Sequence, residues 1–345
     1  MADNSLSGVV DWKLAARTGA KLARSGPATS RYTAEKAVRD LADASVRAEM
    51  PVREVTGLAD GLPIPTARIL DRAGWIEAAA QSMAQLTGDE GEPGFLVGKP
   101  AGIQAGAMLA YLSSAILGQY DPFTGENGTL LLVSPNVIAV ERALRVDPAD
   151  FRLWVCLHEV THRVQFSSSP WLTEYMKDAV ETLGAGDEES LTDSIGRLST
   201  LVRDRGRTDT TDGAPGGIVG LLRATQAEPQ REALDRLLVL GTVLEGHADH
   251  VMDAVGPAVV PSVAKIRQAF DGRRQRKSNP VHRLIRALLG MDAKMAQYVR
   301  GKNFVDAVVA QVGMEQFNTI WTGPETMPKL CEIDDPAAWT TRVLG

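Results

Sequence analysis

The sequence predicts a mainly α-helical (α+β) fold that contains one small β-sheet. Most stretches of the 345-residue chain carry apolar residues at a spacing of three or four, which is typical of helices with one buried face. The strongest strand candidate is the segment 129–133, which is short, continuously apolar and bounded by Gly128 and Pro135. Because so few strands are expected, the sheet should be a minor part of the fold.

Three helices are expected before this strand. The first should begin near Thr33, a residue suited to cap a helix, and continue through Val46. A second is expected over residues 67–86, and a third, rich in small residues, over residues 101–117. The acidic, glycine-rich residues 88–94 between them should form a loop.

The helix after the strand has the clearest start in the chain. Asp147 is a favourable capping residue, and Pro148 suits a first helical turn because its missing N–H would have no partner there. This helix is expected over residues 148–166. Another should cover residues 229–255, with further helices from about residue 280 to the end.

The sequence also predicts which segments are flexible and where the domain begins. Residues 205–217 and 271–280 are rich in polar side chains and glycine or proline, and we expect them to be flexible. Residues 1–30 should form a partly flexible N-terminal segment. Residues 31–345 are expected to form a single domain.

Composition narrows the class of protein. Hydrophobic residues make up 44% and charged residues 23%, and the net charge of −6 comes from scattered charges of both signs, so no nucleic-acid surface is indicated. No window approaches the roughly 18 apolar residues of a membrane helix, and no secretion signal is evident. Cys156 and Cys331 do not suggest a disulfide framework, which favours a cytoplasmic location.

The strongest functional motif is the five-residue segment His158-Glu159-Val160-Thr161-His162, in the helix expected over residues 148–166. Residues four apart share one face of a helix, so His158 and His162 can direct both imidazoles at one ion. Zinc suits this pair because it accepts imidazole nitrogens and leaves a position for water. Glu159 lies at the edge of the same face, where its carboxylate can act as general base. A pair of core histidines is the alternative interpretation.

A third ligand must come from elsewhere in the chain. The metzincin extension requires Gly at position 165 and His at position 168, but the chain has Gln165 and Ser168. In a helix through residues 244–250, Glu245 and Asp249 would share one face. We therefore expect Glu245 to be the third ligand.

Two further roles are expected for this second segment. Asp249 should accept a hydrogen bond from the free ring nitrogen of a zinc-bound histidine. His247 or His250 could replace Glu245 as the ligand, although both point away from its face. The candidates for an oxyanion-stabilising donor are His247, His250, His282, Tyr298 and Arg300.

The motifs resemble those of a zincin-like family of bacterial proteins classed as hydrolases, some of which are associated with biosynthesis of a deazaflavin coenzyme. The resemblance covers most of the chain from about residue 30 and rests on the segments 117–122, 158–166, 245–249 and 290–298, with Phe304-Val305 and Trp339. It implies a zincin-like helical fold with the sheet beside the active-site helix. The Glu245-x-x-x-Asp249 pattern is also similar to the third-ligand segment of gluzincin peptidases.

The sequence thus predicts a hydrolase that holds one zinc ion and cleaves a peptide, or a small amide or ester. Glu159 would be its general base, and neither a nucleic acid nor a membrane is an expected partner. The alternative is a zincin fold that binds metal or a partner without catalysis. The sequence leaves the natural substrate and the oligomeric state open.

Overall fold

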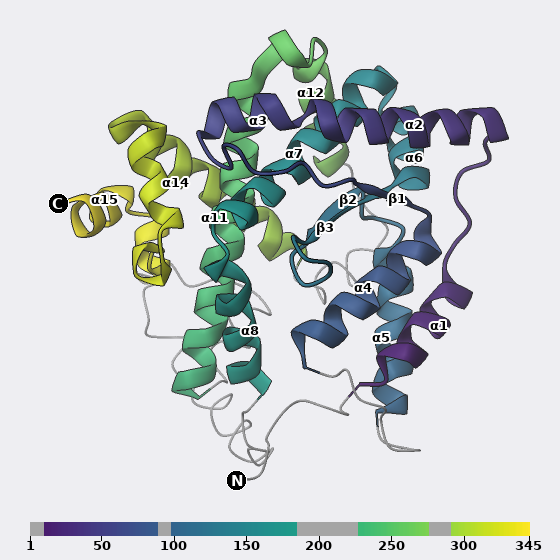
Figure 1. Ribbon diagram of the computed structural model, residues 1–345, viewed down its shortest axis with the longest axis horizontal. Helices are drawn as coiled ribbons and strands as arrows, with labels where there is room; N and C mark the ends of the chain where they lie inside the picture. Colours follow the sequence, from purple (N-terminus) through teal and green to yellow (C-terminus); the bar gives the residue numbers. More distant parts are fainter. Residues whose placement is uncertain (1–9, 89–97, 185–226, 276–290) are drawn as a thin grey trace. The chain divides into compact units, whose positions relative to one another are not determined.

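The structure is a computed structural model, and it describes residues 10–88, 98–184, 227–275 and 291–345 (Figure 1). Contacts between Cα atoms divide the chain into two compact units. The first unit comprises Met1–Thr173 and Val251–Gln275, and the second comprises Glu174–His250 and Arg276–Gly345. The prediction of a mainly α fold with a small sheet is confirmed. That residues 31–345 form a single domain stays a prediction.

The helices and strands follow one another along the chain. The first unit contains α1 (Trp12–Leu22), α2 (Arg31–Arg47), α3 (Glu49–Thr56), β1 (Arg68–Leu70), α4 (Arg72–Leu86), α5 (Lys99–Leu112), β2 (Gly118–Asp121), β3 (Thr129–Val133), α6 (Ser134–Leu144), α7 (Pro148–Ser168) and α12 (Val263–Gln275). Residues of α8 (Trp171–Gly184) and α11 (Glu228–Val259) belong to both units. The second unit also contains α14 (Met291–Phe317), the 3-10 turns Asn318–Trp321, Pro324–Thr326 and Leu330–Ile333, and α15 (Pro336–Leu344).

The three-stranded sheet has the order β1-β3-β2, with β1 parallel and β2 antiparallel to β3. Successive residues of a strand point to opposite faces. Leu130 and Leu132 accordingly pack into the core that contains α7, whereas Leu131 and Val133 pack against α4 and α5. Burial on both faces explains why this strand is continuously apolar.

Two of the predicted boundaries are confirmed. The strand expected over residues 129–133 is β3, and α7 begins at Pro148 as predicted. Asp147 caps α7, since its Oδ1 accepts hydrogen bonds from the backbone N–H of Ala149 at 2.9 Å and of Asp150 at 3.1 Å.

Other boundaries differ from the prediction. The segment 67–86 begins with β1, and α4 starts only after Asp71, whose side chain caps it. The helix expected over 101–117 ends at Leu112, and residues from Gly118 onward pair with β3. Helix α2 is capped by Ser30 and not by Thr33, whose N–H donates to Ser30 Oγ at 3.1 Å.

Helix α1 was not predicted from the sequence, and it packs against α4 and α5. Of the loop expected at residues 88–94, Gly88 lies in a turn and the rest lies outside the described residues, as does the expected flexible segment 205–217. Of the segment 271–280, residues up to Gln275 belong to α12 and the rest lies outside the described residues. No helix in the described part of the chain has the length and apolar character needed to cross a membrane.

In the second unit, α11 and α14 approach at two glycines. A Cβ atom on Gly246 would lie 2.2 Å from the carbonyl carbon of Gly301, and a Cβ atom on Gly301 would lie 2.1 Å from the oxygen of Thr242. The two backbones are therefore in direct contact, which only residues without a side chain permit. Helix α11 keeps helical geometry until Gly256, where φ is 64° and ψ is −167°.

Candidate metal centre

Helix α7 holds the candidate centre in place because one of its faces is deeply buried. Val155, Cys156, Val160 and Val164 belong to the core of the first unit. Burial, together with the charge of Glu159, raises the pKa of the Cys156 thiol well above its ordinary value, so Cys156 stays a neutral core residue. Histidines and carboxylates remain the candidate metal ligands, as the sequence predicts.

His158 and His162 bring two ring nitrogens together on α7. Their Nε2 atoms are 3.3 Å apart, and the rings meet edge to face at 85° with centroids 4.8 Å apart. Two ligands of a tetrahedral zinc with bonds of about 2.0–2.1 Å are themselves about 3.3 Å apart. The histidine pair therefore fits two neighbouring corners of a zinc site.

Gln165 fixes the second of these histidines. Its Oε1 lies 2.9 Å from His162 Nδ1, and its side chain is fully buried. With Nδ1–H donating to this oxygen, the lone pair of His162 is on Nε2, the atom that faces His158. Gln165 differs from the glycine of metzincins and lies in the segment 158–166 that resembles the family, but neither signal predicts this role.

Glu159 is buried against strand β2, with 7% of its surface exposed. A Cβ atom on Gly118 would lie 2.6 Å from Glu159 Cγ and 2.9 Å from its carboxyl carbon. The strand can therefore approach the Glu159 side chain only because residue 118 is a glycine. The sequence signal for this contact was the segment 117–122, which had been noted only for its resemblance to the family.

The other residues of β2 attach this strand to its surroundings. Gln119 Oε1 accepts a hydrogen bond from Trp75 Nε1 at 3.0 Å, and Asp121 Oδ1 accepts one from Ser82 Oγ at 2.7 Å; both donors belong to α4. Tyr120 lies on the opposite face of the strand, where its ring centroid is 5.6 Å from that of Phe166 on α7. Strand β2 is thus held between α4 and α7.

The second predicted segment lies on α11. Glu245 and Asp249 are half-buried residues of the second unit, four positions apart on continuous helix. His247 is fully buried and stacks on Phe317, with ring centroids 5.4 Å apart. His250 Nδ1 lies 2.7 Å from Asp306 Oδ1.

The three other candidate oxyanion donors are outside this segment. Arg300 pairs with Asp334 through contacts of 2.8 and 2.6 Å. His282 and the side chain of Tyr298 lie outside what the structure describes.

Among the described residues, His158 and His162 of the first unit and Glu245 of the second are the histidine and acidic side chains that could together supply three ligands to a metal ion. The group contains two imidazoles and one carboxylate, which is a common ligand set of catalytic zinc sites.

Comparison with known proteins identifies the family. The sequence profile of the zincin-like metallopeptidases matches residues 10–340. The chain belongs to the zincin-like metallopeptidase family. A solved structure from Chloroflexus aurantiacus, described as a "putative hydrolase with a novel fold", is 28% identical, with a TM-score of 0.66 over 96% of this chain and 98% of that one. No curated protein matches the chain. Family membership confirms the resemblance noted from the motifs and supports a zinc-dependent hydrolase.

Proposed function

We propose that the protein is a zinc-dependent hydrolase that cleaves peptide or amide bonds. His158, His162 and Glu245 would be the ligands of one zinc ion, and Glu159 would be the general base. The observation that carries this proposal is the 3.3 Å separation of the Nε2 atoms of His158 and His162. The buried Glu159 directly follows His158 in the sequence.

The chemistry divides between the metal and the chain. Zinc bound there would supply Lewis-acid activation of water and of the substrate carbonyl. Glu159 accepts the proton of the attacking water and returns it to the leaving amine. Strand β2 covers the Glu159 side chain at Gly118, which restricts the carboxylate to few rotamers and reduces its contact with bulk water.

The choice of Glu245 as third ligand is supported by the course of α11. Val251, Met252 and Val255 of this helix pack into the same core as Val155 and Val160 of α7. Glu245 precedes Val251 by six residues of continuous helix, which correspond to about 9 Å along the axis. The four-residue spacing from Glu245 to Asp249 is gluzincin-like, and we propose that Asp249 orients a zinc-bound histidine through its free ring nitrogen.

The conservative variant Glu159→Gln tests the mechanism. We expect it to bind one zinc ion per chain as the wild type does, while hydrolysis of a responsive peptide or amide substrate falls by at least about 100-fold, because the general base is lost. Zinc content measured by atomic absorption and kcat/KM measured on the same preparation give both results. Full activity of the zinc-loaded variant would contradict the mechanism. A zinc-loaded wild type that cleaves no peptide, amide or ester would favour a non-catalytic, metal-binding protein.

The ligand set is tested by metal stoichiometry in Glu245→Ala and His250→Ala side by side. We expect zinc to be lost only from Glu245→Ala, because His250, five residues further along continuous helix, points to a different side of α11. Zinc that is retained in Glu245→Ala but lost from His250→Ala would overturn the assignment.

A further inference from the structure

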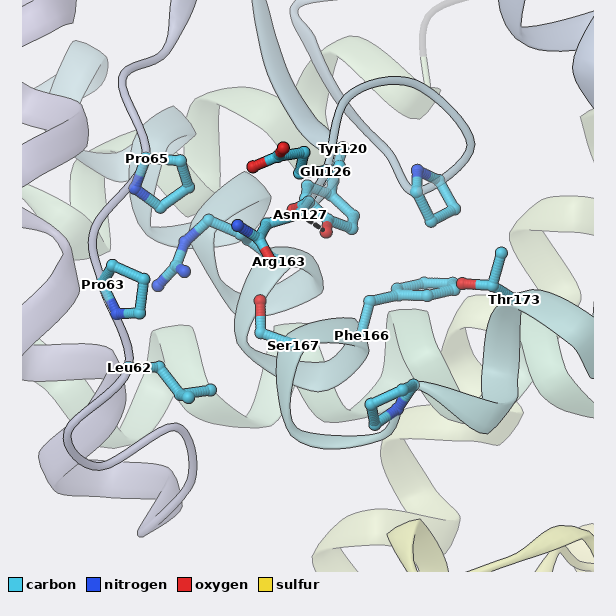
Figure 2. Close-up of a pocket in the computed structure, with 13 residues that line it drawn as sticks. Leu62, Pro63, Pro65, Tyr120, Glu126, Asn127, Arg163, Phe166, Ser167 and Thr173 are labelled. Carbon is cyan, nitrogen blue, oxygen red and sulfur yellow. Dashed lines mark hydrogen bonds between the residues drawn. The ribbon is translucent and has the colours of Figure 1, made fainter.

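A pocket of about 190 Å³ opens in the first unit beside α7. Its walls come from the segment 62–65, the β2–β3 hairpin, the C-terminal part of α7 and the start of α8. They include Pro63, Tyr120, Asn127, Arg163, Phe166 and Thr173 (Figure 2). The pocket has room for one side chain of a bound molecule. Nothing assigned so far to the metal centre uses it.

The pocket is lined by residues that closely follow Glu159 on α7 and Gly118 on β2. Arg163 follows Glu159 by four residues on α7, which places it on the same side of the helix about 6 Å further along the axis. Tyr120 follows Gly118 by two residues on β2, so it is on the same face about 7 Å further along the strand. Each of these distances corresponds to about two residues of an extended peptide, which rises about 3.3 Å per residue. A substrate cleaved at Glu159 would therefore place an adjacent group at this pocket.

The wall formed by Arg163 belongs to a buried cluster with an excess of positive charge. Arg163 and Glu49 form an ion pair in which both side chains are 1% exposed. Arg53 Nε also contacts Glu49 Oε2, at 3.1 Å, so one carboxylate serves two guanidinium groups. Burial makes such an uncompensated charge costly, and it favours an additional anion nearby.

Two N–H groups of this cluster have no hydrogen-bond partner among the described residues. Arg53 Nη2 and Arg163 Nε are buried, and neither makes a hydrogen bond in the described part of the chain. Unpartnered buried donors on a guanidinium are uncommon, because each costs free energy unless a ligand or water accepts from it. Figure 2 shows the Arg163 side chain extending toward Pro63 and Pro65 at the wall of the pocket.

We propose that this pocket binds a carboxylate of the substrate, through Arg163 backed by Arg53, next to the bond that is cleaved. The inference rests on the proposed hydrolase function and names its substrate class: peptides that carry a carboxylate beside the scissile bond. That carboxylate is either an acidic side chain or the C-terminus, and both offer the same paired oxygen acceptors to the guanidinium. Glu126, an exposed residue that lines the pocket, opposes the anion and limits its affinity.

Binding to the metal-free wild-type protein tests the pocket separately from catalysis. Three alanine pentapeptides are compared by calorimetry: a blocked peptide with a central Glu, the same peptide with a central Gln, and the Gln peptide with a free C-terminal carboxylate. We expect one of the two carboxylate peptides to bind at least about tenfold more tightly than the blocked Gln peptide. Which of them does so identifies the source of the carboxylate. Equal dissociation constants for all three would overturn the proposal.

Two variants locate the effect without removing the buried ion pairs. Thr173→Asp places a competing carboxylate at the pocket wall and should abolish the tenfold preference, whereas the matched control Thr173→Asn should keep it. Glu126→Gln removes the opposing charge and should increase the preference. A preference that is the same in Thr173→Asp, Thr173→Asn and wild type would place the carboxylate elsewhere and contradict the proposal.

Hydrolysis of the same peptides by the zinc-loaded protein separates the two proposals. Cleavage without any preference for a carboxylate would support the hydrolase and contradict the pocket assignment. Selective binding without cleavage of any of the three peptides would support the pocket assignment and contradict peptide hydrolysis.

Discussion

The position of the Glu159 carboxylate depends on a residue that has no side chain. Gly118 lets strand β2 approach so closely that even a methyl group would overlap the Glu159 Cγ atom, at 2.6 Å. Two other residues of the same strand, Gln119 and Asp121, anchor β2 to α4, so the strand cannot easily move away. The carboxylate that we propose as general base is thus positioned by a contact that the sequence around Glu159 does not reveal.

Gly118→Ala should therefore impair catalysis more than folding. We expect kcat/KM to fall by about 100-fold, because a carboxylate displaced by roughly 1 Å no longer meets the attacking water correctly. Zinc stoichiometry should stay at the wild-type value. The matched control is Gly74→Ala in α4, where the added Cβ would make only ordinary contacts of 3.4 Å or more. Equal loss of activity in both variants would contradict a positioning role for Gly118.

Gln165 should control zinc affinity through His162. In Gln165→Leu the imidazole loses the acceptor for its Nδ1–H, and we expect the zinc dissociation constant to rise by about 10- to 100-fold. Gln165→Glu retains an acceptor oxygen and should stay close to wild type. Competition with a chromogenic chelator measures both constants, and a leucine variant with unchanged affinity would argue against this role.

At the scale of elements, the helix that contains Glu245 is fixed by its crossing with α14. The contact is made by Gly246 and Gly301, and the first of these directly follows Glu245. Because the backbones touch, the rotation of α11 about its own axis is tightly restricted in the second unit. This restriction determines which face of α11 presents Glu245 and Asp249.

Gly246→Ala should be strongly destabilising. The new methyl group would lie 2.2 Å from a backbone carbon of α14, and forcing two helices apart costs about 1–3 kcal/mol or more of the free energy of unfolding. Gly241→Ala is the control on the same helix, since its Cβ meets nothing within 4 Å and alanine favours the helix by up to about 1 kcal/mol. Chemical denaturation of both variants measures the difference, and a Gly246→Ala protein as stable as wild type would disagree with the close crossing.

The elements differ in how far the sequence could predict them. Helix α7 and strand β3 were predicted correctly, because their caps and apolar patterns are local signals. Strands β1 and β2 were missed. They have only three and four residues, and they form because β3 offers unpaired backbone groups on both edges, which is a tertiary effect.

At the scale of the molecule, the hydrophobic core of the first unit contains no proposed metal ligand. It joins α2, α3, α7, α12 and the strands through one continuous set of buried apolar residues, which includes the residues of α7 that flank the histidines. His158 and His162 themselves are only half-buried. The hydrophobic core, and not the metal, should therefore supply most of the stability of this unit.

Removal of zinc should stop hydrolysis without unfolding the protein. After chelation we expect the far-ultraviolet circular dichroism to be unchanged and Tm to fall by several degrees, because zinc at about 100 times its Kd adds only about 2.7 kcal/mol. Activity should return when zinc is added back. Cooperative unfolding on chelation would instead indicate a structural metal.

The sequence by itself determined the fold class, the helix that contains His158, Glu159 and His162, and the direction of these side chains, because a four-residue spacing and an Asp-Pro cap are encoded locally. Only the tertiary structure decided what surrounds them. It placed Gln165 beside the His162 ring, Gly118 against the Glu159 side chain and Arg163 at the wall of a pocket. Those contacts depend on how helices and strands pack, and packing joins residues whose separation along the chain carries no periodic signal.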